Sequence, residues 1–321
     1  MPVRFTTPSL GGQSRTDVGP HQWQVAVAYR RLTADEWYVG TRVQENKAPF
    51  GQPLFLNITS LDVGVSYGVT SRLGLTLTLP FSRGTHSRLY ADLTRHVVSA
   101  AGLGDMSLVG TLWLGQPATH ESGNLALGLG VKAPTGSNHV RDNFYTTTGT
   151  TQYPVDQAIQ LGDGGWGVLF QTQAFRRLRG DWFTYASGSY LVSPRVKSDV
   201  QFANARGVGS GIYLSVPDVY TARGGVSYTL SSARGLSATF GSRIDGIPVR
   251  DLVGGGDDGF RRPGYTLYAD PGAAVGIGKG SLTLSVPIKL TSDFKSDLTP
   301  GHPKGGDLAE YLVFAGYVYR F

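Results

Sequence analysis

The segment Leu73–Ser82, LGLTLTLPFS, alternates strictly between large apolar residues and small or polar ones. Successive side chains of a β-strand point to opposite faces, so one face of this segment is wholly apolar and the other is not. The same alternation appears in residues 125–131 and 282–290, where Leu, Val and Ile alternate with Gly, Ala, Thr, Ser, Pro or Lys. These three segments predict strands that each present one apolar face.

Working outward from these segments, similar stretches recur about twelve times along the chain. Each is about as long as the 9 to 11 residues that a tilted strand needs to cross a bilayer. The expected strands lie at residues 20–32, 57–70, 73–83, 103–115, 124–133, 164–176, 181–193, 214–230, 235–246, 264–277, 281–292 and 309–321. A two-layer sandwich could not bury so many apolar faces from both sides.

The links between these strands alternate in length. Short links are expected near 70–73, 116–123, 178–181, 231–235 and 278–281, and long ones at 33–56, 84–102, 134–163, 194–213, 247–263 and 293–308. Outer-membrane barrels have tight periplasmic turns and long external loops. The fold class predicted is therefore all-β, a transmembrane antiparallel up-and-down β-barrel of about 12 strands over residues 20–321. Residues 1–19 are expected to form a flexible periplasmic segment, and residues 91–100 a short helix in an external loop.

Composition supports this interpretation and excludes several other classes. The 321 residues are 40% apolar and have a mean hydropathy of -0.11, which excludes membrane-spanning helices. Cysteine is absent, which removes disulfides, thiolate nucleophiles and Cys-ligated zinc. The net charge of +6 is scattered along the chain, so no nucleic-acid partner is expected. Residues 1–10 lack the apolar core of a signal peptide, so an exported barrel would have lost its signal before this chain begins.

Aromatic residues fall near the expected ends of strands, where outer-membrane barrels carry girdles at the two lipid interfaces. The alternative, which places the same rings in a soluble core, stays open at this point. The predicted interface aromatics are Trp23, Phe81, Trp113, Trp166, Tyr228, Tyr265 and Tyr319. We expect outer-membrane lipid as the main partner of the outer face, and a location in the outer membrane of a Gram-negative-type envelope.

The last eleven residues, YLVFAGYVYRF, resemble the C-terminal signal by which outer-membrane proteins engage the barrel assembly machinery. The residues that carry this resemblance are Tyr311, Tyr317, Tyr319 and the terminal Phe321. The resemblance implies that the assembly machinery is a partner during biogenesis. The final strand must also pair with the first near Trp23, because an open edge cannot persist in lipid.

Three internal segments are similar to the family of outer-membrane transporters named for the meta pathway of phenol degradation (MetA-type). They are GLGDMSL at 102–108, GLGVKAPTG at 128–136 and GDGGWGV at 162–168. The resemblance covers about residues 100–175 well and the rest by pattern alone. It implies passage of small, often aromatic or hydrophobic compounds, and it establishes no particular solute.

If the apolar faces contact lipid, the opposite faces line the interior of a narrow lumen. The residues predicted there are Gln24, Asp62, Lys132, Gln171, Gln173, Arg223, Arg243, Asp245, Asp270 and Lys289. Arg243 and Asp245 lie two apart on one strand and share a face. Two interpretations remain open: basic residues that favour or orient a polar solute group, and a salt-bridged network that only fills the barrel.

Other chemistry-bearing residues give weaker signals. His86 and Ser87 invite comparison with outer-membrane phospholipases but lack the residues that follow the nucleophile there. None of the six His shows spacing typical of metal sites, and Asp257 with Asp258 offers too few carboxylates for calcium. We therefore expect no enzyme activity, no cofactor and no metal.

The predicted function is that of an outer-membrane channel or transporter for passive uptake of small, hydrophobic or aromatic solutes through a narrow lumen. The alternatives are a structural or scaffold barrel with envelope protein partners and, third, a surface lipase.

Overall fold

The computed structural model describes residues 17–44, 54–201, 211–254, 259–302, 304–306 and 309–321, and this part of the chain is built from strands. Twelve strands or strand pairs form the wall: β1(Trp23–Ala34), β4(Phe55–Gly68), β5(Leu73–Leu89), β6(Arg95–Leu103) with β7(Ser107–Trp113), β8(Gly123–Lys132), β11(Gly167–Arg179), β12(Trp182–Val192), β15(Val219–Ser231), β16(Leu236–Ile247), β17(Gly264–Ile277), β18(Gly280–Ser285) with β19(Ile288–Phe294), and β20(Tyr311–Arg320). Six short strands lie in the links between the wall strands: β2(Tyr38–Val39), β3(Arg42–Val43), β9(Arg141–Thr146), β10(Gly149–Pro154), β13(Lys197–Gln201) and β14(Tyr213–Ser215). Within the described residues, no helix is long and apolar enough to span a membrane.

The wall is one closed sheet. Its 14 strands include two interrupted pairs, because β6 and β7 both pair with β5, and β18 and β19 both pair with β17. Counting each pair as one strand leaves twelve. Closure comes from antiparallel pairing of β1 with β20, from Gln24 opposite Arg320 to Thr33 opposite Tyr311. The predicted fold class, a twelve-stranded antiparallel barrel closed by its last strand, is confirmed.

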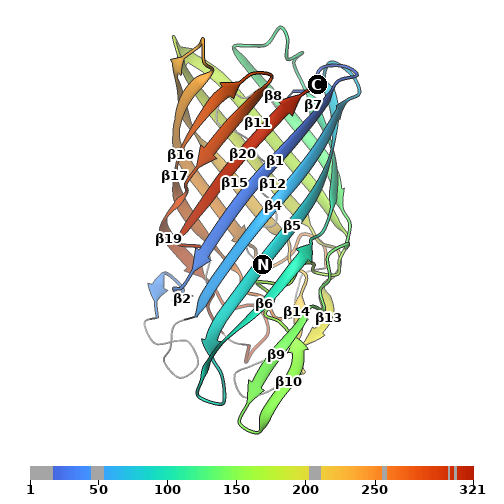
Figure 1. Cartoon of the computed structure of the whole chain (residues 1–321), viewed down its shortest axis with the longest axis vertical. Coiled ribbons are helices and arrows are strands. Elements are labelled where there is room, and N and C mark those ends of the chain that lie inside the picture. Colours follow the sequence, from blue (N-terminus) through green and yellow to red (C-terminus); the bar gives the residue numbers. More distant parts are fainter. Residues whose placement is uncertain (1–16, 45–53, 202–210, 255–258, 303, 307–308) are drawn as a thin grey trace.

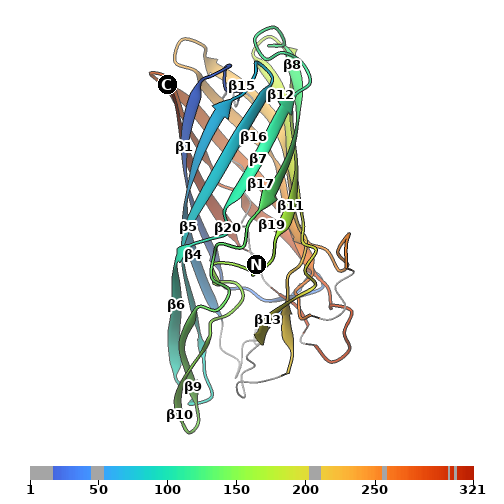
Figure 2. The ribbon, with the colours of Figure 1, turned by 90° about the vertical axis from the view of Figure 1, so that its right-hand side faces the viewer.

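The two ends of the barrel differ (Figures 1 and 2). Tight turns gather at the end that holds the C-terminus, whereas β2, β9, β10, β13 and β14 lie at the opposite end with the long links. We refer to these as the turn end and the loop end. The turn end also holds Trp23 at the start of β1, whose carbonyl accepts a hydrogen bond from the Phe321 N–H at 3.1 Å. Both ends of the wall therefore lie at the turn end.

One predicted loop is wrong. Residues 84–102 do not form a long link, because β5 continues to Leu89 and β6 returns beside it from Arg95. The helix expected at 91–100 is wrong for the same reason. Val97 and Val98 are β-branched and favour the extended chain, and the connection is a tight turn with Leu93 at φ 60°.

Two prolines coincide with breaks in the wall. Pro287 separates β18 from β19, and both strands pair with β17 in the same register on either side of it. Pro80 lies in β5 opposite the break between β6 and β7, where its carbonyl accepts a hydrogen bond from Gly104 N–H at 2.7 Å. Proline removes a donor from the hydrogen-bond ladder, so a break or bulge at such positions is expected.

The alternation of the sequence appears as alternation of burial. In β5, Leu75, Leu77 and Phe81 are exposed, while Thr76, Thr78 and Pro80 face the interior of the closed sheet. The same holds for Leu125, Leu127, Leu129 and Val131 of β8. A closed barrel leaves its large apolar side chains exposed only when lipid is the surrounding solvent.

Candidate functional site: the charged interior and the link folded over it

The ten residues predicted to face the interior are all buried or half-buried, although they come from eight different wall strands. Lys132 and Asp270 are fully buried, whereas Gln171, Gln173, Arg223 and Lys289 are half-buried. That they line a path for solute stays a prediction.

Charged side chains of β15, β16 and β17 form two ion pairs. Arg223 and Arg243 lie directly opposite each other in the register of β15 and β16. Like charges in directly opposite positions repel each other. Each of the two guanidinium groups is neutralised by a carboxylate. Arg223 lies 2.8 Å from Asp270 Oδ2, and Arg243 Nε donates to Asp245 Oδ2 at 2.9 Å. Arg243 and Asp245 therefore do interact through their shared face, and the interior combines both signs of charge.

A third ion-pair group lies nearer the loop end. Lys289 Nζ is 2.6 Å from Glu36 Oε2 and 3.1 Å from Glu310 Oε1. Glu36 belongs to the link after β1 and Glu310 to the link before β20. Lys289 thus ties two loop-end links to β19.

Aromatic rings also face the interior. Trp113 is 7% exposed and packs edge-on against Phe175, with ring centres 6.2 Å apart. The prediction that Trp113 lies at the lipid interface is therefore wrong. Its strand position has the parity of buried Val109, whereas Leu108, Leu112 and Leu114 carry the exposed face. Of the other six predicted interface aromatics, Tyr265 is half-buried and the rest are exposed, namely Trp23, Phe81, Trp166, Tyr228 and Tyr319. Their place in a girdle at the lipid interface stays a prediction.

The link between β8 and β11 folds onto the inner wall at the loop end. It contains the hairpin β9–β10, followed by a segment in which Val155, Ile159 and Leu161 are buried. Val155 and Ile159 join an apolar core that contains Tyr90, directly after β5, and the following residues of the wall: Leu32, Ala34, Leu56, Ile58, Val98, Ala100, Tyr268 and Leu312. This core reaches from β17 across the closing seam to β6, and it narrows the interior at this end.

Two wall glycines make room for the segment. A Cβ atom at Gly84 of β5 would lie 2.6 Å from Ile159 Cγ2, and one at Gly102 of β6 would lie 2.8 Å from Leu161 Cδ1. Real Cβ contacts are not this short, so any larger residue at Gly84 would push Ile159 away. The wall is shaped to receive residues 155–163.

Lys132 anchors the same segment with a buried charge triad. Its Nζ donates to Asp105 Oδ2 at 2.9 Å and to Asp163 Oδ1 at 2.5 Å, and all three side chains are almost wholly inaccessible to solvent. Asp105 Oδ1 accepts a hydrogen bond from Gly136 N–H at 3.0 Å, and Asp163 Oδ1 accepts one from Gly165 N–H at 2.9 Å. A buried charge pair persists only when such additional hydrogen bonds satisfy it.

The triad explains the three Gly-rich motifs. Each motif contributes one charged residue, and the glycines allow backbone to pack on backbone: a Cβ at Gly136 would lie 2.8 Å from the Gly104 carbonyl carbon, and one at Gly162 would overlap Gly136. Thr135 Oγ1 completes the contact by donating to Gly104 O at 2.9 Å and accepting from Met106 N–H at 2.8 Å. At the break between β6 and β7, Gly104 and Met106 thus form hydrogen bonds with the Thr135 side chain where bonds to a neighbouring strand are missing. We call this arrangement the motif latch.

Lys132 was predicted as an interior residue from the alternation of its strand, whereas Asp105 and Asp163 were not predicted. Both stand within the quoted motifs, next to glycines. A signal was available: one lysine and two aspartates in three Gly-rich segments, each at the end of an expected strand, where an unpaired charge would be costly.

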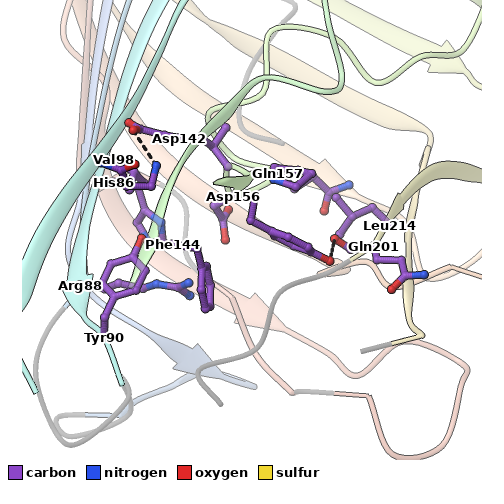
Figure 3. A pocket seen from close by; sticks show the side chains of 14 residues that line it. His86, Arg88, Tyr90, Val98, Asp142, Phe144, Asp156, Gln157, Gln201 and Leu214 are labelled. Carbon is purple, nitrogen blue, oxygen red and sulfur yellow. Dashed lines mark hydrogen bonds between the residues drawn. The ribbon is translucent and has the colours of Figure 1, made fainter. Parts of the chain in front are cut away.

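A second charged cluster lies at the loop end between the β5–β6 extension and the folded link (Figure 3). His86 and Arg88 of β5 and Tyr90, directly after β5, face Phe144 of β9 and Asp156 of the segment after β10. The guanidinium of Arg88 lies 4.6 Å from the ring centre of Tyr90 and 5.5 Å from that of Phe144. The cavity among these residues is about 30 Å³, enough for about two water molecules and too small for a solute.

Burial and neighbouring charges set the protonation of this cluster. The outward face of β5 turns polar at Arg83, so His86 lies beyond the part of β5 that spans the membrane. Burial lowers the pKa of His86 to about 4; Asp156 opposes this shift, and Arg88 and Arg262 add to it. Burial acts to raise the pKa of Asp156, but the charges of His86, Arg262 and Arg88 and a hydrogen bond from Ala158 N–H lower it to about 2.

Acid should therefore loosen the folded link. Unfolded His86 binds a proton below about pH 6.5, whereas the docked form resists protonation until about pH 4, so docking weakens as pH falls between these values. The loss is on the order of 3 kcal/mol, and loss of the Asp156 contribution follows between about pH 3.8 and 2. Hydrogen exchange of the Ile159 amide, which bonds to Asp156 O at 3.0 Å, should report the opening.

His86→Asn is the control for this prediction. It should remove the change in exchange between pH 6.5 and 4 and leave the lower window in place. Equal sensitivity in the parent and the variant over the upper window would show that another group is responsible.

The remaining candidate sites do not assemble. His86 is buried inside the wall, and the adjacent Ser87 is on the other face, where its Oγ accepts a hydrogen bond from Arg95 at 3.2 Å. Neighbouring residues of a strand point apart, so these two cannot form a nucleophile and base. Asp257 and Asp258 lie outside the described residues, as do residues 1–16 of the expected N-terminal segment. Within the described ranges, no three His, Asp or Glu residues lie close enough to hold a metal.

A closed antiparallel barrel with an apolar outer wall, a charged interior, short turns at one end and long links at the other defines an outer-membrane β-barrel protein, and this fold places the chain in the outer membrane. Neither a family model nor a curated protein matches the sequence.

Several solved structures resemble the fold. The COG4313 outer membrane channel from Pseudomonas putida F1 is 17% identical, with a TM-score of 0.66 over 98% of this chain and 100% of that chain. The CymD monoaromatic hydrocarbon channel is 10% identical over 94% and 89% of the two chains, with a TM-score of 0.48. The P. putida toluene transporter TodX is 11% identical over 94% and 91%, with a TM-score of 0.46. At these identities the likeness to the first concerns the fold, and the other two are more distant.

Proposed function

We propose that this barrel is a passive channel for small solutes that carry an aromatic or hydrophobic group. The observation that carries the proposal is the interior, in which paired charges of Arg223–Asp270 and Arg243–Asp245 share the space with inward-facing aromatic rings. The full-length fold likeness to an outer membrane channel supports it.

Polar groups in the interior favour a solvated lumen over a dry filled core. The hydroxyls of Ser60, Ser227 and Ser237 and one carboxylate oxygen of Asp62 are buried with no hydrogen-bond partner among the described residues. Buried polar atoms in native proteins are nearly always satisfied, by protein or by ordered water. Water inside the barrel would satisfy these four groups and provide a medium for diffusion.

Aromatic side chains suggest the solute class. Trp113 and Phe183 are buried inside the wall toward the turn end, and Tyr185 lies against Arg223, with the guanidinium 5.3 Å from the ring centre. Rings of this kind stack with aromatic solutes, while the arginines can hold an anionic or polar substituent. The resemblance of the three motifs to the meta-pathway family points to the same solutes, and membership of that family is part of the proposal.

Planar-bilayer recording and liposome uptake test the proposal. The purified chain should produce discrete conductance steps and should speed the entry of benzoate and phenol into liposomes relative to glucose. A folded barrel that gives neither conductance nor uptake would contradict it, and would favour the scaffold alternative if protein partners co-purify. Enzyme activity has no support from the site geometry, because His86 and Ser87 face apart.

A further inference from the structure

The outer edge of the apolar band can be located from the register of four neighbouring strands. Tyr29 of β1, Leu61 of β4, Phe81 of β5 and Leu103 of β6 lie in one row. Tyr29, Leu61 and Phe81 are exposed. The outward run of β5 from Leu73 to Phe81 has about the length needed to cross the hydrocarbon layer. This row therefore marks the edge of that layer at the loop end.

The next outward row is cationic. Arg31 of β1 and Arg83 of β5 lie on either side of Thr59 of β4 in the register, and all three are exposed. Two strand spacings separate the arginines, so their Cα atoms are about 10 Å apart. Within the described part of the chain, neither guanidinium has an ion pair or a hydrogen bond.

A polar row follows beyond the arginines. It contains Thr33, Asn57, Thr85 and Ser99, with the Thr33 hydroxyl donating to Asn57 Oδ1 at 3.2 Å. From the membrane outward, this sector thus presents aromatic and aliphatic groups, then two cations, then hydroxyl and amide groups. That order matches the acyl chains, phosphates and sugars of a glycolipid.

The cations do not form an even rim. On the sector where β17 meets β19, the outward position next to Tyr265 is occupied by Asp293, whose carboxylate lies 3.7 Å from Lys295. An anionic headgroup would therefore find the sector of β1, β4 and β5 more favourable than this one. The asymmetry argues for a localised site.

We propose that Arg31, Arg83 and Thr59 bind the phosphate of a phosphorylated glycolipid in the outer leaflet of the outer membrane. Guanidinium groups bind phosphate through paired, charge-assisted hydrogen bonds, and cations at a membrane surface attract anionic headgroups. The lipid is favoured over free phosphate because the site continues directly into the apolar band, where the acyl chains lie against Tyr29, Leu61 and Phe81.

Native mass spectrometry of the full chain in detergent, titrated with bisphosphorylated lipid A, tests the site. Arg31→Gln with Arg83→Gln should weaken binding about tenfold to thirtyfold. The control, Arg176→Gln with Arg179→Gln, removes two exposed arginines at the turn end and should leave binding unchanged. Dephosphorylated lipid A should bind the parent as weakly as the phosphorylated form binds the Arg31/Arg83 variant.

Three outcomes would overturn the proposal. They are equal affinity of parent and Arg31/Arg83 variant for the lipid, equal binding of the dephosphorylated lipid, and full displacement of the lipid by inorganic phosphate, which would indicate a site for a free anion. A gel shift on heating shows whether each variant is folded. Arg31→Lys with Arg83→Lys preserves the charge and should retain most of the affinity, which separates loss of charge from loss of fold.

Discussion

Replacement of Lys132 by Met should lower the free energy of unfolding by about 3 to 5 kcal/mol, because it leaves the carboxylates of Asp105 and Asp163 buried without their cation. Both carboxylates also hold backbone groups of Gly136 and Gly165, so the loss should spread through the motif latch. Urea unfolding of the barrel in lipid vesicles, followed by tryptophan fluorescence, measures the change.

Two variants isolate the cause. Adding Asp105→Asn and Asp163→Asn to Lys132→Met removes the unpaired charges while keeping oxygen acceptors, so most of the lost stability should return. Lys295→Met removes an exposed lysine and should change stability by no more than about 0.5 kcal/mol. A loss below about 1 kcal/mol for Lys132→Met alone would show that the triad does not hold the link in place.

Replacement of Ile159 by Asp should raise single-channel conductance severalfold. Ile159 is 3% exposed in the loop-end core, and its side chain lies over Gly84. A carboxylate cannot stay in this apolar contact without a large cost, so residues 155–163 should separate from the wall and widen the interior. Planar-bilayer recording measures the effect.

Gly84→Val tests the same contact from the wall, since its side chain would displace Ile159, and it should raise conductance in the same direction. Leu93→Asp is the matched control, because Leu93 is 69% exposed at the tip of the β5–β6 hairpin and should leave conductance unchanged. If both core variants fold and conduct like the parent, the folded link does not limit passage through the barrel.

Most of the wall could be predicted because its forces are local. Alternation fixes which side chains face lipid, and the length of each alternating run fixes how many strands fit, so the twelve expected strands are present. The predictions were wrong where strand pairing outweighed the local preference of the residues. Residues 91–100 contain helix-compatible residues, yet β5 supplies a partner strand; Trp113 has an aromatic ring suited to an interface, yet its parity turns it inward.

The interior could be predicted only in part. Arg243 and Asp245 are two residues apart on one strand, so sequence placed them together, and they are 2.9 Å apart. The ion-pair partner of Arg223 could not be predicted from spacing along one strand, because Asp270 belongs to β17, two strands away in the sheet. The acid-sensitive cluster could not be predicted for the same reason, because Asp156 and His86 are far apart in the sequence and only the fold brings them together.

The sequence by itself determined the barrel: a repeated two-residue period, short links at one end of the wall, and a final strand that pairs with the first. The tertiary structure alone decided how the barrel is filled. Lys132, Asp105 and Asp163 meet because the end of β8, the break between β6 and β7 and the segment before β11 converge on the inner wall. Residues 155–163 dock because Gly84 and Gly102 leave space for them. Periodicity acts between neighbours along the chain, whereas burial of a charge or a side chain depends on segments that only closure of the sheet brings together.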